Sequence, residues 1–114
     1  ESTSKVIAQC KRIKSRVSPK VVRELEGTVL NCGLDYIGIL ASTMPASDQC
    51  INRIKHSKLP LMFMQISEFR INGVLMSHSF QQKFPQIVIA PIRDVNGLHY
   101  EIFNGRLNMK SNLN

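Results

Sequence analysis

The sequence predicts an α/β domain in which a mixed sheet is flanked by helices. Within residues 5–66, three apolar runs of strand length alternate with two segments of helical periodicity, the order typical of parallel strands joined by crossover helices. Later, two apolar runs lie on either side of Asn96-Gly97, a dipeptide typical of hairpin turns. The 114 residues, 43% of them apolar, suffice for one modest core. We therefore expect one domain over residues 1–104 and a polar tail at 105–114 that frays.

The first predicted strand covers Lys5–Lys11. Side chains alternate along a strand, so Gln9 and Lys11 point to one face and Cys10 points to the other. A basic connection, residues 12–17, follows directly. The strand therefore ends in two polar side chains that face the same way, next to a run of positive charge.

The first predicted helix runs from Pro19 to about Asn31. Ser18-Pro19 is a favourable start, because a serine oxygen can cap free N–H groups and proline is tolerated in the first turn. Gly33 supplies a stop after the helix. The helix places its apolar residues in one stripe, made of Val21, Val22, Leu25, Val29 and Leu30.

Two further strands and a second helix are predicted before residue 67. Tyr36–Ala41 and Leu61–Ile66 are compact apolar runs typical of buried strands. Between them, the segment from Ser47 to about His56 has helical periodicity. Its inward side carries Cys50, Ile51 and Ile54.

The pattern is weaker in the last part of the chain. We expect residues 68–79 to be helical or irregular. Gln86–Ile92 is a clear strand and Leu98–Phe103 is a weaker one. The short connection between them predicts a hairpin.

Composition argues against several classes of protein. Cys10, Cys32 and Cys50 are an odd set without a C-x-x-C pair, which favours reduced thiols over a disulfide framework or a zinc ribbon. The three histidines are scattered, which argues against a histidine-based metal site. No run approaches the roughly 18 apolar residues of a membrane span, so we expect no membrane partner.

The positive charge is concentrated in one segment. The net charge is +7, and residues 5–23 hold seven basic residues and no acidic one, while the remaining eight basic residues balance the eight acidic ones. Such a field suits a polyanion, because neutralised phosphates release counterions. A solvated loop that aids solubility is the alternative, and charge alone does not separate the two. Aromatic residues are only 6% of the chain, which argues against a base-stacking platform for single strands.

The segment from Lys5 to Ile66 resembles a known family. The features are an apolar strand that ends in Gln9-Cys10-Lys11, a basic connection, a capped helix, and an apolar strand with glycine at 36–41. This combination is similar to the Mrr-type branch of the restriction-endonuclease-like PD-(D/E)xK nucleases. Within that branch it most resembles the fungal mitochondrial family named for its requirement in respiratory growth. The resemblance implies a restriction-endonuclease-like mixed sheet flanked by helices and a mitochondrial location.

The resemblance also implies a Mg²⁺-dependent phosphodiesterase site at one end of the sheet. Gln9 would lie beside the metal, Lys11 would polarise the attacking water, and the carbonyl of Cys10 would be a metal ligand. Mg²⁺ prefers such hard oxygen ligands. The partner would be the phosphate backbone of DNA or RNA, read with little sequence preference. The residues expected to hold it are Lys11, Arg12, Lys14, Arg16, Lys20 and Arg23.

The sequence departs from the family pattern at the metal site. The family carries an aspartate on a preceding strand, and residues 1–4 offer no counterpart. Glu24 could supply a carboxylate from the helix, although an ion pair with Lys20 is the simpler interpretation. A Gln-x-Lys motif is also weak alone, since a second copy occurs at 81–83. We therefore expect that an N-terminal part of the fold is missing and that the site is incomplete.

Two functions follow from these observations. The first is a nuclease-fold domain that binds nucleic acid and hydrolyses phosphodiesters with Mg²⁺ in the complete protein. The alternative is a non-catalytic nucleic-acid-binding or assembly module with a degenerate site. The residues that would act in catalysis are Gln9 and Lys11.

Overall fold

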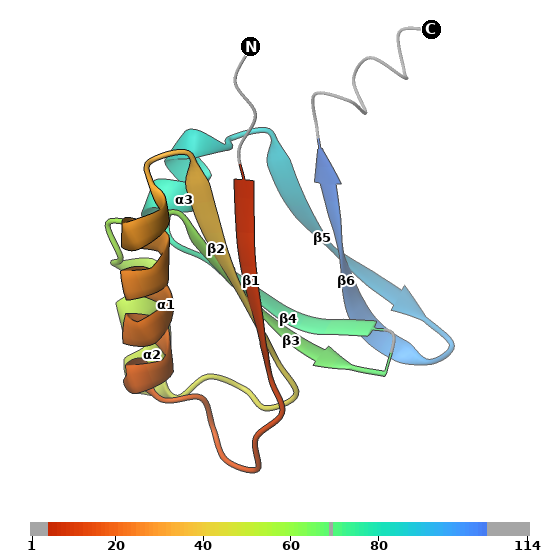
Figure 1. The fold of residues 1–114 in the computed structure, drawn as a ribbon. Coiled ribbons are helices and arrows are strands. Elements are labelled where there is room, and N and C mark those ends of the chain that lie inside the picture. The colour runs from red at the N-terminus through yellow and green to blue at the C-terminus, as the bar shows by residue number, and fades with distance from the viewer. Residues whose placement is uncertain (1–4, 69, 105–114) are drawn as a thin grey trace, which may run out of the picture.

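A computed structural model describes residues 5–68 and 70–104 (Figure 1). Its first five elements alternate as the sequence predicts, and the described residues form a four-stranded sheet, a separate two-stranded hairpin and three helices. The predicted tail at 105–114 and residues 1–4 lie outside the described residues. The elements are β1 (Lys5–Lys11), α1 (Pro19–Cys32), β2 (Tyr36–Ser42), α2 (Asp48–Lys55), β3 (Leu61–Ser67), β4 (Arg70–Met76), α3 (His78–Lys83), β5 (Ile87–Asp94) and β6 (Gly97–Asn104).

The sheet is mixed, as predicted. Its strands lie in the order β1-β2-β3-β4, and β1, β2 and β3 are parallel. The fourth strand, β4, runs antiparallel to β3. The alternation of strand and helix in the first 67 residues therefore produces the parallel pairing that was expected, and the three carboxyl ends of β1, β2 and β3 meet at one edge of the sheet.

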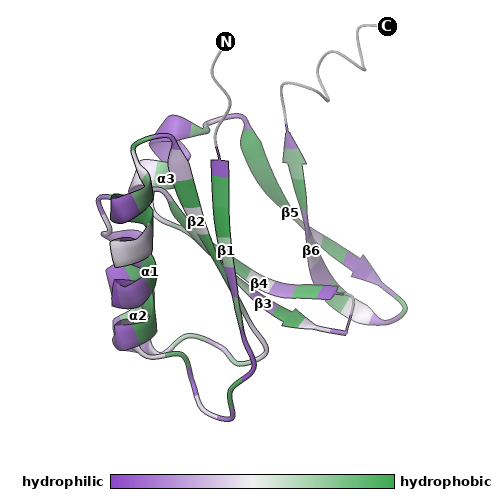
Figure 2. Cartoon of the chain, in the orientation of Figure 1, coloured by the Kyte–Doolittle hydropathy of each residue, from purple (hydrophilic) through white to green (hydrophobic). Residues whose placement is uncertain are grey.

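Helices α1 and α2 lie side by side on one face of the sheet (Figure 1). The side of α1 that meets the sheet is hydrophobic and its outer side is hydrophilic (Figure 2). Val22, Leu25 and Val29 are buried there against Leu40 and other sheet residues. Leu30 was expected in the same stripe, but it is 65% exposed, because the stripe that contacts the sheet is narrower than the apolar pattern suggests.

The serines that precede α1 and α2 behave differently. Ser18 precedes α1 in an extended conformation, but its side chain makes no capping hydrogen bond, so the expected cap is wrong. Pro19 has no N–H to satisfy, and the N–H of Val21 donates to the backbone carbonyl of Ser18 at 3.1 Å. At α2, by contrast, Ser47 Oγ accepts a hydrogen bond from the backbone N–H of Cys50 at 3.1 Å.

Residues 68–79 were expected to be helical or irregular, but residues 70–76 form the whole of strand β4 and residues 78–79 begin helix α3. Glu68 adopts a left-handed conformation with φ of 51°, which reverses the chain after β3. The chain then pairs with β3 as β4, and a register shift between Gln65 and Ile66 accommodates the turn. The short helix α3 follows and buries Phe80.

The other face of the sheet holds a second, smaller core. Ile37, Met62 and Phe80 are buried in it, and Ile87 at the start of β5 packs against them. The hairpin of β5 and β6 is confirmed, with Asp94 opposite Gly97 and a two-residue turn at 95–96. Gly97 has φ of +107°, a conformation that glycine adopts without steric cost. Among the described residues no helix is both long and apolar enough to cross a bilayer.

Candidate nucleic-acid interface

The connection after β1 carries three of the seven basic residues of segment 5–23, and its end is firmly anchored. Val17 is fully buried, its N–H donates to the carbonyl of Pro45 at 2.9 Å, and its carbonyl accepts from the N–H of Ser47 at 3.0 Å. This bridge joins the connections that follow β1 and β2. The basic residues therefore project from a loop whose base is tied to the core, directly beside the carboxyl ends of the parallel strands.

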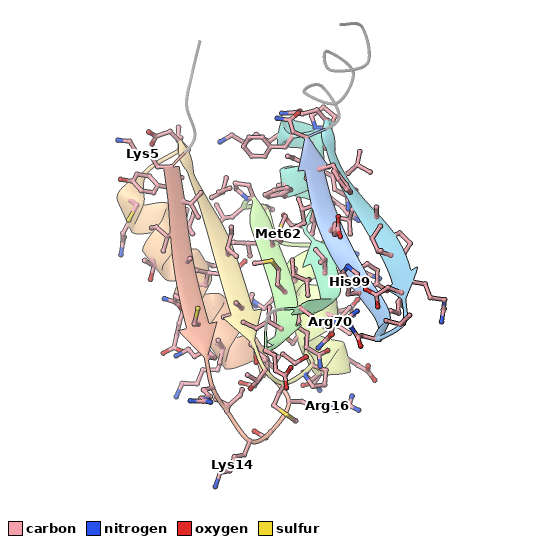
Figure 3. All side chains as sticks on the ribbon, turned by 90° about the vertical axis from the view of Figure 1, so that its right-hand side faces the viewer. Lys5, Lys14, Arg16, Met62, Arg70 and His99 are labelled. Carbon is pink, nitrogen blue, oxygen red and sulfur yellow. The ribbon has the colours of Figure 1, made fainter. Side chains whose placement is uncertain are left out.

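Five basic side chains on this connection and on the first turns of α1 are exposed. None of them forms an ion pair within residues 5–68 and 70–104. Lys14 lies at the tip of the connection and points away from the sheet (Figure 3). Their charges are thus available to an anionic partner. We call Arg12, Lys14, Arg16, Lys20 and Arg23 the basic surface.

Gln9 and Lys11 share one face of β1, as predicted. Ile7, Gln9 and Lys11 are half-buried, whereas the alternate residues of β1 are exposed. Gln9 is in register with Leu40, which belongs to the core under α1 and α2, so this face is the one that the helices cover. Lys11 lies further toward the carboxyl edge, next to the basic surface.

A polar row crosses the sheet at this edge. Lys11 is in register with Ser42, and Ser42 is in register with Gln65 of β3, so the three residues lie on adjacent strands that are roughly 4.8 Å apart. Ser42 and Gln65 were not predicted as site residues, because Ser42 follows directly after an apolar run and Gln65 lies within another one. Ser42 is fully buried, and its Oγ accepts from the N–H of Met44 at 3.0 Å.

The Cys10 carbonyl faces the outer edge of β1. The backbone N–H of Lys5 donates to the carbonyl of Asp35, and the backbone N–H of Thr43 donates to the carbonyl of Lys11. Every second residue of β1, counted from Lys5, therefore directs its backbone N–H and C=O toward β2. The peptide groups between them, including that of Cys10, point away from β2. The carbonyl expected to serve as a metal ligand is therefore directed outward, while the Cys10 side chain lies on the face opposite Gln9 and Lys11.

The residues of this edge do not fit Mg²⁺ by themselves. Mg²⁺ is bound in proteins through carboxylates together with other oxygens. Within the described part of the chain, no group of three or more His, Cys, Asp or Glu side chains is placed to hold a metal. Glu24 is exposed and forms no ion pair with Lys20 in those residues, contrary to the interpretation drawn from the sequence. We derive no hydrolytic step from these residues.

Comparisons with known proteins give one family and two relatives. A family model described as "Required for respiratory growth protein 7" matches residues 1–90. A mitochondrial protein of Schizosaccharomyces pombe, named as uncharacterized, is 33% identical over 63 residues, which are 55% of this chain and 26% of that protein. "Required for respiratory growth protein 7, mitochondrial" of Candida glabrata is 30% identical over 71 residues, which are 57% of this chain and 28% of that protein. No solved structure matches.

These comparisons show where the relatives are located in the cell and how much of their length this chain covers. Both relatives are named as mitochondrial, which confirms the mitochondrial location that the resemblance implied. The chain spans about a quarter of the length of the curated relatives it matches, 26% and 28%. The family match covers the sheet, α1, α2, α3 and the first residues of β5.

Proposed function

Because the chain belongs to the family of Required for respiratory growth protein 7, which is linked to mitochondrial respiratory growth, we propose that it binds the phosphate backbone of DNA or RNA in mitochondria. The observation that carries the proposal is the basic surface: five exposed cations without ion-pair partners in the described residues. They lie on one anchored connection and the helix turns that follow it.

The geometry favours backbone contacts over base recognition. Arg and Lys on a loop tip and a helix start can reach successive phosphates, and phosphate contacts carry no sequence information directly. No aromatic residue lies between positions 5 and 23, where it could stack on a base. We therefore propose binding with strong salt dependence and little sequence preference.

The restriction-endonuclease-like relationship and Mg²⁺-dependent hydrolysis are proposals for the full-length protein. Gln9 and Lys11 support them, since they share one face at the carboxyl end of β1, beside the basic surface. Lys11 at such a place could orient an attacking water beside a bound phosphodiester. The described residues supply cations for binding but no set of carboxylates for a metal, so backbone binding without hydrolysis is the function we propose for this domain itself.

Fluorescence anisotropy tests the binding proposal. Labelled duplex DNA, single-stranded DNA and RNA are titrated with the protein at two salt concentrations. The variant Lys14→Gln/Arg16→Gln should weaken binding at least about tenfold at low salt, since two phosphate contacts are lost. The control Lys55→Gln/Arg93→Gln removes the same charge from exposed residues elsewhere and should change binding less than about twofold. Equal weakening by both variants would refute a defined surface.

A cleavage assay separates the two forms of the proposal. Full-length protein and its Lys11→Ala variant are incubated with Mg²⁺ and either plasmid DNA or structured RNA. Cleavage that is lost in the variant would support hydrolysis and the role of Lys11. Binding without cleavage by both proteins would leave the non-catalytic module.

A further inference from the structure

A groove lies between α1 and α2 on their outer sides, away from the basic connection at residues 12–17. It has a volume of about 730 Å³ and is lined by α1 from Arg23 to Leu30 and by the end of α2 with the residues that follow it. A smaller hollow of about 190 Å³ shares Leu30, Lys58 and Leu59 with it and extends to Tyr36. The two hollows therefore form one continuous surface, with Arg23 and Arg53 in the larger hollow, Tyr36 in the smaller one, and Lys58 beside the two leucines in the wall between them.

One end of the groove is cationic. Arg23 and Arg53 line it, Lys58 lies in the wall shared with the smaller hollow, and Glu26 is the one acidic side chain among the described residues that line the groove. Glu26 is engaged at both carboxylate oxygens: Arg53 Nη2 lies 2.8 Å from Oε1, and Ser57 Oγ donates to Oε2 at 2.6 Å. The carboxylate is thereby neutralised, and it holds the guanidinium of Arg53 in position. Arg23 and Lys58 form no ion pair in the described residues and remain available to an anion.

The other end is apolar. Leu30 is 65% exposed, and it lies in the wall shared by both hollows with Leu59, which is half-buried. Tyr36 adds an aromatic ring beyond them. An exposed leucine beside fixed cations suits a ligand with an apolar or planar body next to its negative charge.

Gly27 keeps the floor of the groove open. It lies within α1, where glycine costs roughly 0.5–1 kcal/mol relative to alanine. A Cβ at this position would meet no atom within 4 Å, so packing inside the chain does not require glycine. A side chain at position 27 would instead occupy the space of the groove.

We propose that this groove binds a small organic phosphate, with the phosphate at Arg23 and Lys58 and the apolar or planar body over Gly27 and Leu30. Arginine and lysine both bind phosphate oxygens, and the pairing of Glu26 with Arg53 keeps the one carboxylate in the described lining from repelling the phosphate. Arg23 belongs to both the groove and the basic surface, whereas Gly27, Leu30 and Lys58 lie outside the basic surface, so the two proposals can be tested with different substitutions.

Calorimetric titration of the full-length protein with adenosine monophosphate tests the proposal. Gly27→Met keeps every charge, and its side chain leans toward Arg23, since helical side chains point to the N-terminal turn. It should weaken binding at least about tenfold, as should Lys58→Gln. Adenosine without phosphate should not bind measurably. Thermal unfolding checks the fold, and Gly27→Met should be as stable as the parent, because methionine is the better helix former.

Matched controls make each outcome decisive. Lys55→Gln removes a charge from α2 outside the groove, and Lys14→Gln/Arg16→Gln removes charge from the basic surface; both should keep the affinity for the monophosphate. The groove is refuted if Gly27→Met binds as well as the parent or if Lys55→Gln weakens binding as much as Lys58→Gln. Lys14→Gln/Arg16→Gln should weaken nucleic-acid binding while it keeps the affinity for the monophosphate, so failure of one proposal is distinguishable from failure of the other.

Discussion

Arg70 of β4 and His99 of β6 meet side by side, with Nη2 of the arginine 2.8 Å from Nδ1 of the histidine (Figure 3). A guanidinium only donates, so Nδ1 must accept, and the ring proton lies on Nε2, which is 3.2 Å from Glu101 Oε2. Arg70 also donates to Asp94 Oδ1 at 3.3 Å and to the carbonyl of Gly97 at 3.4 Å. The Arg70 side chain of the four-stranded sheet is thus hydrogen-bonded to the turn end of the β5–β6 hairpin.

Arg70→Ala should loosen the hairpin. The substitution removes charge-assisted hydrogen bonds from a half-buried position, and we expect the free energy of unfolding to fall by about 1–2 kcal/mol. Amide hydrogen exchange should accelerate in β6 more than in β1 or β2, because Arg70 bonds only near the hairpin turn. Arg93→Ala is the control: Arg93 is an exposed residue of β5 that forms no ion pair in the described chain. Equal exchange in both variants would contradict the role of Arg70.

Glu26→Ala should destabilise the contact between α1 and α2. Its carboxylate is 15% exposed and accepts from Arg53 and Ser57, so truncation leaves the buried serine without that partner. We expect a loss of about 1–2 kcal/mol in the free energy of unfolding, measured by urea denaturation. Glu24→Ala is the matched control on the same helix. Glu24 is exposed and without an ion pair in the described residues, so its loss should lie within about 0.5 kcal/mol.

The sequence predicted the elements whose local signals are strong. β1 begins and ends at the predicted residues, and α1 starts at Pro19 as expected. The strand pattern of the first segment and the helical pattern of the second are separated by a basic stretch that ends in a proline, which marks the boundary clearly. The parallel pairing followed from element order alone. β4 was missed because Asn72 and Gly73 interrupt its apolar alternation, and both residue types are depleted in strands. Its pairing with β3 is a tertiary effect that a local pattern does not contain.

The candidate site was predictable only in part. The common direction of Gln9 and Lys11 follows from strand alternation, and the charge of the basic surface follows from composition. The row of Lys11, Ser42 and Gln65 was not predictable, because it depends on the register of three strands. The groove between α1 and α2 likewise joins residues about 30 positions apart, such as Gly27 and Lys58, through helix packing rather than through a motif.

Gly38→Ala should be strongly destabilising. A Cβ at Gly38 would lie 2.8 Å from Val29 Cγ2 and 3.0 Å from Leu61 Cδ2, so α1 would have to move away from β2. Overpacking of this kind costs about 1–3 kcal/mol. Gly73→Ala is the control in the same sheet, since its Cβ would meet Gln65 at an ordinary 3.8 Å. Thermal unfolding of both variants tests the pair, and similar midpoints would contradict the close approach at Gly38.

Cys50 should make stability fall as the pH rises above 9. Burial raises the pKa of the Cys50 thiol from its ordinary value of 9.0 to about 11, because desolvation disfavours the thiolate. In the unfolded chain the thiol loses its proton near pH 9, whereas in the folded chain it keeps the proton until about pH 11. The contribution of the neutral thiol is therefore fully present below pH 9 and is lost between pH 9 and 11.

Urea denaturation between pH 8 and pH 10.5 measures this contribution. Cys50→Ala should lower stability throughout, because it opens a small cavity, and should also flatten the decline above pH 9 relative to the parent. Cys32→Ala is the control, since Cys32 is exposed and its removal should preserve the decline. The same burial predicts that a thiol reagent at pH 8 modifies Cys10 and Cys32 in the folded chain, and Cys50 only after unfolding. An unchanged pH profile in Cys50→Ala would show that other groups cause the loss of stability, because the two proteins differ in this one titrating thiol.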